Sequence, residues 1–173
     1  GVEARGSDTN IQAVAEFQGQ LFSQEDLDTF FRMYVPKYQA FSKVYKTVGD
    51  KQQGEGVEAN LDIQFIMGVA PKVKTEVWQY AGMDFCSDLI TWTNQILSTK
   101  DGRPSVFSVS YGWQGPLSQL GCTDAQVKAV DANFAKAGSV GTTIIFASGD
   151  SGAQYMNNQL WPSWPASSQH VPA

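Results

Sequence analysis

The hydrophobic and polar positions of the chain follow two periods, one typical of strands and one typical of helices. Alternating or β-branched runs predict strands over residues 10–17, 41–48, 75–81, 105–112 and 142–147. Apolar residues at helical spacing predict helices over residues 24–34, 86–97 and 123–138. Ser23 and Thr123 precede two of these helices as caps, and Pro36 and Gly138 stop them. Strands that alternate with helices in this way predict an α/β fold with a mainly parallel sheet.

Residues 57–65 fit neither period cleanly. Their apolar and polar side chains alternate strictly, which predicts a strand, whereas Glu, Ala, Leu and Gln are good helix formers. The choice sets the spacing of two carboxyl groups, since Glu58 and Asp62 lie roughly 13 Å apart in a strand but with Cβ atoms about 5–6 Å apart in a helix. A strand, or a solvated helix face, gives the two acids no joint role. A buried helix makes them a coupled pair, in which one carboxyl is a base and the other orients it.

A third acid follows the last expected strand. Asp150 lies in the stretch FASGDSG, a glycine-bounded turn directly after a β-branched run. One interpretation is a turn-forming or helix-capping aspartate. The other is a carboxyl group that points into a cleft, because ligands of parallel sheets bind beyond the carboxyl ends of the strands.

Composition and charge exclude some classes of partner. Only 17% of the residues are charged, the net charge is −5, and Lys and Arg form no clusters, which argues against nucleic acid and anionic membranes as partners. No apolar run reaches 18 residues, so we expect no membrane span. The chain has one histidine, His170, in its proline-rich tail, so a Ser-His-Asp arrangement within these residues is not expected. Cys86 and Cys122, at two expected helix starts, form either one disulfide or two buried thiols.

Several motifs together resemble a known family. The stretches GVEANLDIQFIMGVAP, SVSYG, TIIFASGDSGA and WPASSQHV are similar, in order and spacing, to the sedolisins, which are serine-carboxyl peptidases with a subtilisin-like fold. The stretch AEFQGQLFSQEDLDTFFRMYV resembles the branch that contains the lysosomal tripeptidyl peptidase. The resemblance runs from about residue 10 to residue 171. It implies a three-layer α/β fold, with helices on both faces of a mainly parallel sheet.

The resemblance also implies roles for the three acids. Glu58 matches the family's general base, which takes the proton of the nucleophilic serine, and Asp62 matches the aspartate that orients this base. Asp150 matches the aspartate that stabilises the oxyanion. A glutamate base works in mild acid, where a histidine would be protonated. An ionised aspartate only accepts hydrogen bonds, so an oxyanion-stabilising Asp150 must carry a proton.

Further residues are expected to line the substrate cleft. By the same resemblance, two strand ends would line it, and an extended peptide would lie beside them. Trp113, where relatives often have an acidic residue, is a candidate wall of a substrate pocket. The expected substrate-binding residues are Ser110, Tyr111, Gly112, Trp113, Ser148 and Gly149.

One element of the family pattern is missing. The nucleophilic serine of the family lies in a Gly-Thr-Ser-Ala motif further along the chain, and residues 1–173 contain no such motif. Neither Ser151 nor the serines of residues 166–168 match it. We therefore expect residues 1–173 to be the N-terminal portion of one peptidase catalytic domain. The serine and the calcium site of the family would lie in missing sequence or in a second chain from the same precursor.

Two classes of function remain open from the sequence. The first is an acid-acting peptidase, either an endopeptidase or a tripeptidyl-peptidase, that cleaves peptides or proteins through an acyl-enzyme. Such an enzyme is expected to be secreted or to work in an acidic, lysosome-like compartment. The second is a non-catalytic α/β binding fragment that lacks the nucleophile.

Overall fold

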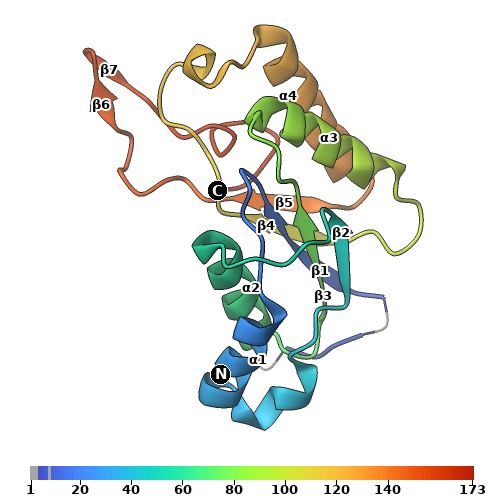
Figure 1. Ribbon diagram of the computed structural model, residues 1–173. Coiled ribbons are helices and arrows are strands. Elements are labelled where there is room, and N and C mark those ends of the chain that lie inside the picture. The colour runs from blue at the N-terminus through green and yellow to red at the C-terminus, as the bar shows by residue number, and fades with distance from the viewer. Residues whose placement is uncertain (1–3, 8) are drawn as a thin grey trace.

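A five-stranded parallel sheet forms the centre of the molecule (Figure 1). The structure is a computed structural model that describes residues 4–7 and 9–173. Every neighbouring pair of strands in the sheet is parallel. In spatial order the strands are β2 (Lys46–Gly49), β3 (Lys74–Gln79), β1 (Ile11–Glu16), β4 (Val106–Val109) and β5 (Thr143–Phe146). The expectation of a mainly parallel sheet is confirmed.

Helices cover both faces of this sheet (Figure 1). On one face, α1 (Gln24–Tyr34) and α2 (Val57–Val69) pack over Val14 and Val77. On the other face, α3 (Phe85–Ser98) and α4 (Asp124–Ser139) enclose a larger, aromatic core around the fully buried Trp78 and Trp92. Two 3-10 helices, η1 (Pro36–Phe41) and η2 (Leu117–Leu120), lie in connections. No helix in the described part of the chain is long and apolar enough to cross a membrane.

Two helices, α1 and α4, have the side-chain N-caps that the sequence predicts. Ser23 accepts a hydrogen bond from the backbone of Asp26 at the start of α1, and Thr123 forms a capping box with Gln126 at the start of α4. These contacts satisfy backbone N–H groups that have no partner within the helix. α1 therefore spans the residues that the sequence predicts, and α4 is displaced by one residue.

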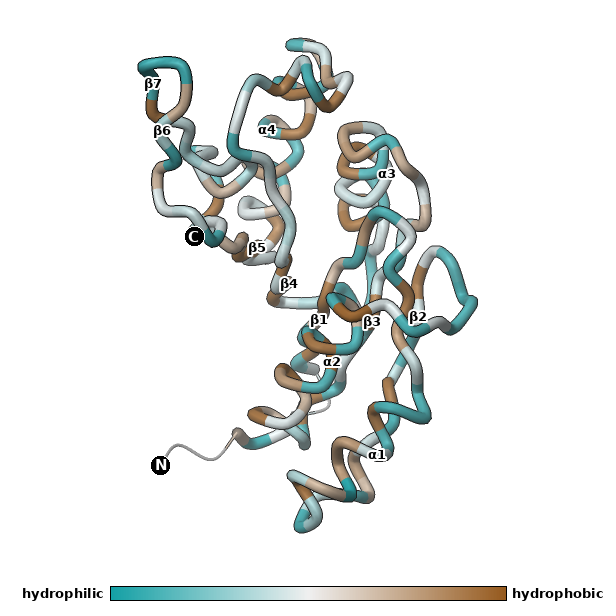
Figure 2. Tube along the Cα trace, turned by 60° about the vertical axis from the view of Figure 1, so that its left-hand side comes forward, coloured by the Kyte–Doolittle hydropathy of each residue, from teal (hydrophilic) through white to brown (hydrophobic). Residues whose placement is uncertain are grey.

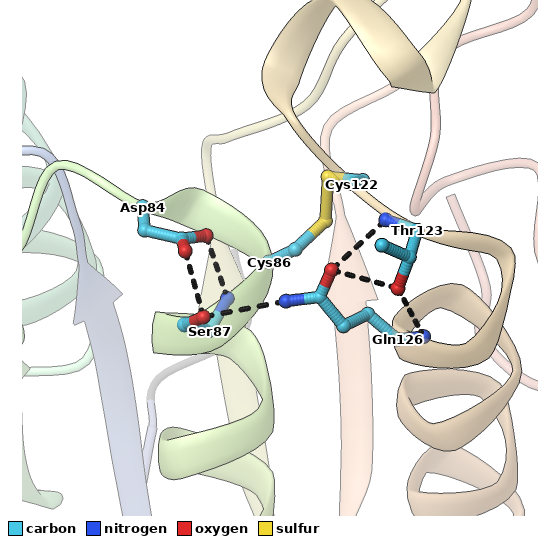
Figure 3. The surroundings of a disulfide bond; sticks show 6 residues. All are labelled: Asp84, Cys86, Ser87, Cys122, Thr123 and Gln126. Atoms are coloured by element: carbon cyan, nitrogen blue, oxygen red, sulfur yellow. Dashed lines mark hydrogen bonds between the residues drawn. A yellow bond between two sulfur atoms is a disulfide. The ribbon is translucent and has the colours of Figure 1, made fainter.

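A disulfide between Cys86 and Cys122 joins the starts of the two helices on the aromatic face (Figure 3). The two Cα atoms lie 5.7 Å apart. Gln126 of the α4 cap also donates to Ser87 Oγ of α3 at 3.3 Å. The first turns of α3 and α4 are thus held together by a covalent bond and a hydrogen bond.

Two parts of the chain differ from the sequence-based expectation. The strand expected over residues 41–48 begins only at Lys46, because Pro36, at the first position of η1, favours a helical turn that runs to Phe41. A short hairpin of β6 (Tyr155–Met156) and β7 (Gln159–Leu160) was not predicted. Its turn residues Asn157 and Asn158 adopt positive φ angles of 53° and 60°, as two-residue hairpin turns require.

Candidate active site

α2 settles the ambiguity of residues 57–65 in favour of a helix. Its inward row, Ala59, Ile63 and Met67, is buried against the sheet, at spacings of four residues. Its outward row is also apolar and is offset from the inward row by two residues: Val57, Leu61, Phe65 and Val69. Two apolar helical rows with this offset produce the strict alternation that imitates a strand, and Figure 2 shows hydrophobic residues recurring along α2. Of the two alternatives that the sequence left open, the helix is the one that the structure shows.

The helix brings Glu58 and Asp62 onto adjacent turns and connects Asp62 to the sheet. Ser110, directly after β4, donates its hydroxyl to Asp62 Oδ1 at 2.9 Å. Asp62 Oδ2 is buried and has no hydrogen-bond partner. This contact ties Asp62 to the carboxyl end of a central strand.

The two carboxyl groups perturb each other. Burial, followed by the charges of Asp62 and Asp150, raises the pKa of Glu58 above its ordinary value. Burial also raises the pKa of Asp62, although hydrogen bonds from Ser110 and Glu58 oppose this shift. The hydrogen bond between the two carboxyls raises the pKa of Glu58 and lowers that of Asp62. The pKa values of both carboxyl groups are therefore raised, so the pair ionises less readily than two exposed acids.

A cleft of about 640 Å³ opens beside this pair. Glu58 lies on its wall, and so does Asp150, which is held in the turn after β5 by a positive φ of 88° at Gly149. Asp150 is near enough for its charge to affect Glu58. The cleft is lined by Glu58, Leu61, Ser110, Tyr111, Gly112, Trp113, Gln114, Ala147, Gly149, Asp150, Ser151, Gln154 and Ser163.

Most of the residues expected at the cleft are found there, and one is not. Ser148 lines a separate pocket of about 280 Å³, which shares Gly149 and Ser163 with the cleft. Neighbouring residues of an extended segment point to opposite sides. Ala147 lines the cleft, and Ser148 lines the neighbouring pocket. A substrate contact of Ser148 remains a prediction.

The proline-rich tail forms part of the cleft wall. Trp113 and Trp164 exchange two backbone hydrogen bonds, N to O, of 2.8 and 2.9 Å, as an isolated antiparallel bridge. This bridge fixes the backbone of Trp113 beside the cleft. The sequence assigns no regular element to the tail, and the bridge shows what orders it there.

Glu16 is a fourth carboxyl group at this site, and the sequence analysis missed it. It ends β1, is fully buried, and accepts a hydrogen bond of 3.1 Å from the Tyr111 hydroxyl to its Oε2. Its other oxygen, Oε1, is buried without a partner. Burial, followed by the charge of Asp62, raises its pKa to about 8. The sequence feature that could have indicated this residue is an acid at the carboxyl end of an apolar stretch, AVAEF.

The described residues bring together no group of three or more His, Cys, Asp or Glu side chains that could hold a metal ion. The residues that line the cleft offer carboxyl, hydroxyl and amide groups and aromatic rings.

The sequence and the fold of this chain were compared with those of known proteins. No family model matches the chain. Tripeptidyl-peptidase 1 of Canis lupus familiaris is 33% identical over 171 residues, and that of Homo sapiens is 32% identical; in both cases the alignment covers 96% of this chain and 30% of the relative. Pseudomonas sedolisin, a serine-carboxyl proteinase solved with two molecules of pseudo-iodotyrostatin, superimposes with a TM-score of 0.69 at 26% identity, over 94% of this chain and 46% of that chain.

These similarities identify the α/β architecture as the subtilisin-like fold of the serine-carboxyl peptidases. The chain belongs to the sedolisin family, near its tripeptidyl-peptidase branch. It spans about 30% of the length of these curated relatives.

Proposed function

We propose that residues 1–173 supply the acid–base part of a peptidase active site. Glu58 is the general base, Asp62 orients it, and Asp150 stabilises the oxyanion. The observation that carries this proposal is the convergence of Glu58 and Asp150 on one cleft, with Asp62 anchored to Ser110 directly behind it. Membership of the sedolisin family supports the same assignment.

The environment of the pair suits a base that works in mild acid. A general base is most effective when its pKa lies near the working pH. Burial, followed by the charge of Asp62, raises the pKa of Glu58 above the ordinary glutamate range. Ionised Glu58 takes the proton from the nucleophilic hydroxyl as it attacks the peptide carbonyl, and ionised Asp62 stabilises the protonated Glu58 that results.

Asp150 acts on the other side of the reacting carbonyl. The oxyanion that develops there requires a hydrogen-bond donor, and only a protonated carboxyl group donates. Asp150 therefore works as a carboxylic acid, and ionisation of this group ends its contribution. All three roles favour activity in acid, which fits a secreted or lysosome-like acidic compartment.

The substrate is a peptide or protein chain that binds in extended form along residues 110–112. These residues follow β4 and line the cleft. An extended segment beside the cleft offers backbone groups for pairing with a peptide, as in other cases of strand addition. Trp113 provides an aromatic surface for a substrate side chain.

The nucleophilic serine and the calcium ion come from further polypeptide, either in the same chain or in a second chain from the same precursor. The apolar outward row of α2 (Val57, Leu61, Phe65 and Val69) is between 51% and 81% exposed. Ile145 of β5, whose neighbours Ile144 and Phe146 enter the aromatic core, points to the α2 side of the sheet and is 43% exposed. An exposed apolar surface of this kind marks an interface. Because Leu61 of this row also lines the cleft, polypeptide that covers the row would reach the catalytic groups.

The proposal is tested by hydrolysis of a fluorogenic peptide near pH 4 with the complete protein that contains these residues. Glu58→Gln is expected to abolish hydrolysis. The matched control is Glu55→Gln, which changes an exposed glutamate in the loop before α2 and is expected to leave the rate unchanged. A complete protein that is inert at every pH, or a fully active Glu58→Gln variant, would contradict the proposal. Inertness at every pH would favour a binding fragment.

A further inference from the structure

We propose that Gln114 is a positioning residue for Asp150, an inference that rests on the oxyanion role proposed for Asp150. Gln114 follows Trp113 on the cleft wall and comes from the β4 side of the cleft. Asp150 comes from the turn after β5. The side chain of Gln114 connects these two parts of the structure.

The amide nitrogen of Gln114 holds the segment that follows Asp150. Gln114 Nε2 donates to the backbone carbonyl of Gly152 and, at 3.3 Å, to that of Trp161. A side-chain amide has two N–H donors, so both are used here. Gly152 precedes the β6–β7 hairpin and Trp161 follows it. Hydrogen bonds of 2.9 Å from Trp161 N to the carbonyls of Ala153 and Gln154 close the base of the hairpin.

The amide oxygen of Gln114 meets the segment that precedes Asp150. A Cβ atom built on Gly149 would lie 2.9 Å from Gln114 Oε1, a distance that real Cβ atoms rarely approach. The glycine therefore allows the amide to pack directly against the turn. One side chain thus contacts residues 149 and 152, on either side of Asp150.

The backbone that carries Gln114 is itself fixed. Trp113, its neighbour, is locked to Trp164 by two backbone hydrogen bonds. Ser110, four positions before Gln114, holds Asp62. Gln114 therefore holds the Asp150 turn in place relative to the segment that orients Asp62 and, through it, the base.

This arrangement matters for the rate because an oxyanion donor must lie within about 2.7–3.1 Å of the developing charge. A displacement of about 1 Å at a reacting group can cost about 100-fold in rate. Loss of the Gln114 contacts frees the Asp150 turn, so we expect a loss in kcat and not in substrate binding.

The test uses the complete peptidase and a double-mutant cycle. Gln114→Met keeps the length of the side chain and removes its hydrogen bonds. We expect kcat to fall by about 10-fold or more, with KM and Tm close to wild type. In an Asp150→Ala background the donor is absent, so Gln114→Met should have no further effect on kcat. Gln159→Met, the same change at an exposed position of the hairpin, is the control and should leave kcat unchanged.

A pH profile provides an independent readout. In Gln114→Glu, the protonated acid keeps one donor for the carbonyl of Gly152, whereas the ionised acid repels that carbonyl. The rate of this variant relative to wild type should therefore fall as pH rises through the range in which the new carboxyl ionises.

Three outcomes would overturn the inference. A rise in KM with unchanged kcat in Gln114→Met would make Gln114 a substrate contact. An equal loss of kcat in the wild-type and Asp150→Ala backgrounds, or a fall in Tm that accounts for the loss, would make it a general structural residue. Failure of the proposed function is seen separately, since it would appear as full activity in Glu58→Gln or as no activity in the wild-type protein.

Discussion

The Ser110 hydroxyl donates a hydrogen bond of 2.9 Å to Asp62 Oδ1, and this contact joins helix α2 to the carboxyl end of β4. The second oxygen of Asp62 is buried without a partner. A hydroxyl group from another element therefore helps to orient the residue that supports Glu58.

Ser110→Ala is expected to shift the acid side of the pH–rate profile to higher pH. The hydrogen bond from Ser110 lowers the pKa of Asp62, so its loss raises that pKa, and the coupled pair ionises at higher pH. The loss of this hydrogen bond to a half-buried carboxylate should cost about 1–3 kcal/mol of stability. The pH dependence of kcat/KM and a urea titration measure both effects. Ser118→Ala, at an exposed position of η2, is the control, and an unshifted profile in Ser110→Ala would show that this hydroxyl does not tune the pair.

Asp150→Asn should retain part of the activity and extend it to higher pH. An amide donates a hydrogen bond without needing a proton from solution, whereas the aspartate donates only when protonated. Asp150→Ala removes the donor and should lower kcat by about 10²–10³. The pH–rate profiles of both variants give the comparison. An Asp150→Asn protein that is correctly folded but as inactive as Asp150→Ala would count against the oxyanion role.

The stability of the fold is expected to fall as pH rises from about 4.5 to about 8. Burial raises the pKa of Glu16 from 4.5 to about 8, so the folded state holds this proton more tightly than the unfolded state. The resulting stabilisation is fully present below pH 4.5 and is lost as pH rises through the folded-state value. Glu58 and Asp62 have pKa values shifted in the same direction.

Glu16→Gln isolates this effect, because glutamine stays neutral at every pH. The free energy of unfolding of wild type should decrease between pH 4.5 and 8 by an amount on the order of a few kcal/mol more than that of the variant, since one pKa unit corresponds to about 1.4 kcal/mol. Urea titrations at several pH values measure it, with Glu25→Gln on the exposed start of α1 as control. Equal pH dependence in wild type and Glu16→Gln would mean that Glu16 is not held protonated by the fold.

The parallel sheet and most helices could be predicted from local signals. Ser23 and Thr123 cap helices with their own side chains, and β-branched runs need burial on both faces of a sheet. These features act within a few residues of the chain. They can therefore be predicted from the sequence before any tertiary contact is known.

The features that the sequence left open or missed depend on contacts between residues far apart in the chain. The alternation along α2 reflects one row of side chains that packs on the sheet and a second apolar row on the outer face of the helix. The pattern expected for a helix with one buried face contains only the first row. Glu16 gained significance only when the sheet order placed β1 beside β4, which brings Tyr111 to it.

The most direct test of the central claim is to locate the nucleophile that Glu58 activates. The complete protein is treated near pH 4 with a peptide that carries a serine-directed phosphonate, and the labelled residue is identified by peptide mapping. If Glu58 activates a serine outside residues 1–173, that serine alone is labelled. The labelling is then lost in Glu58→Gln and retained in Glu55→Gln. A label on Ser151 or on another serine of this segment, or labelling that is unaffected by Glu58→Gln, would contradict it.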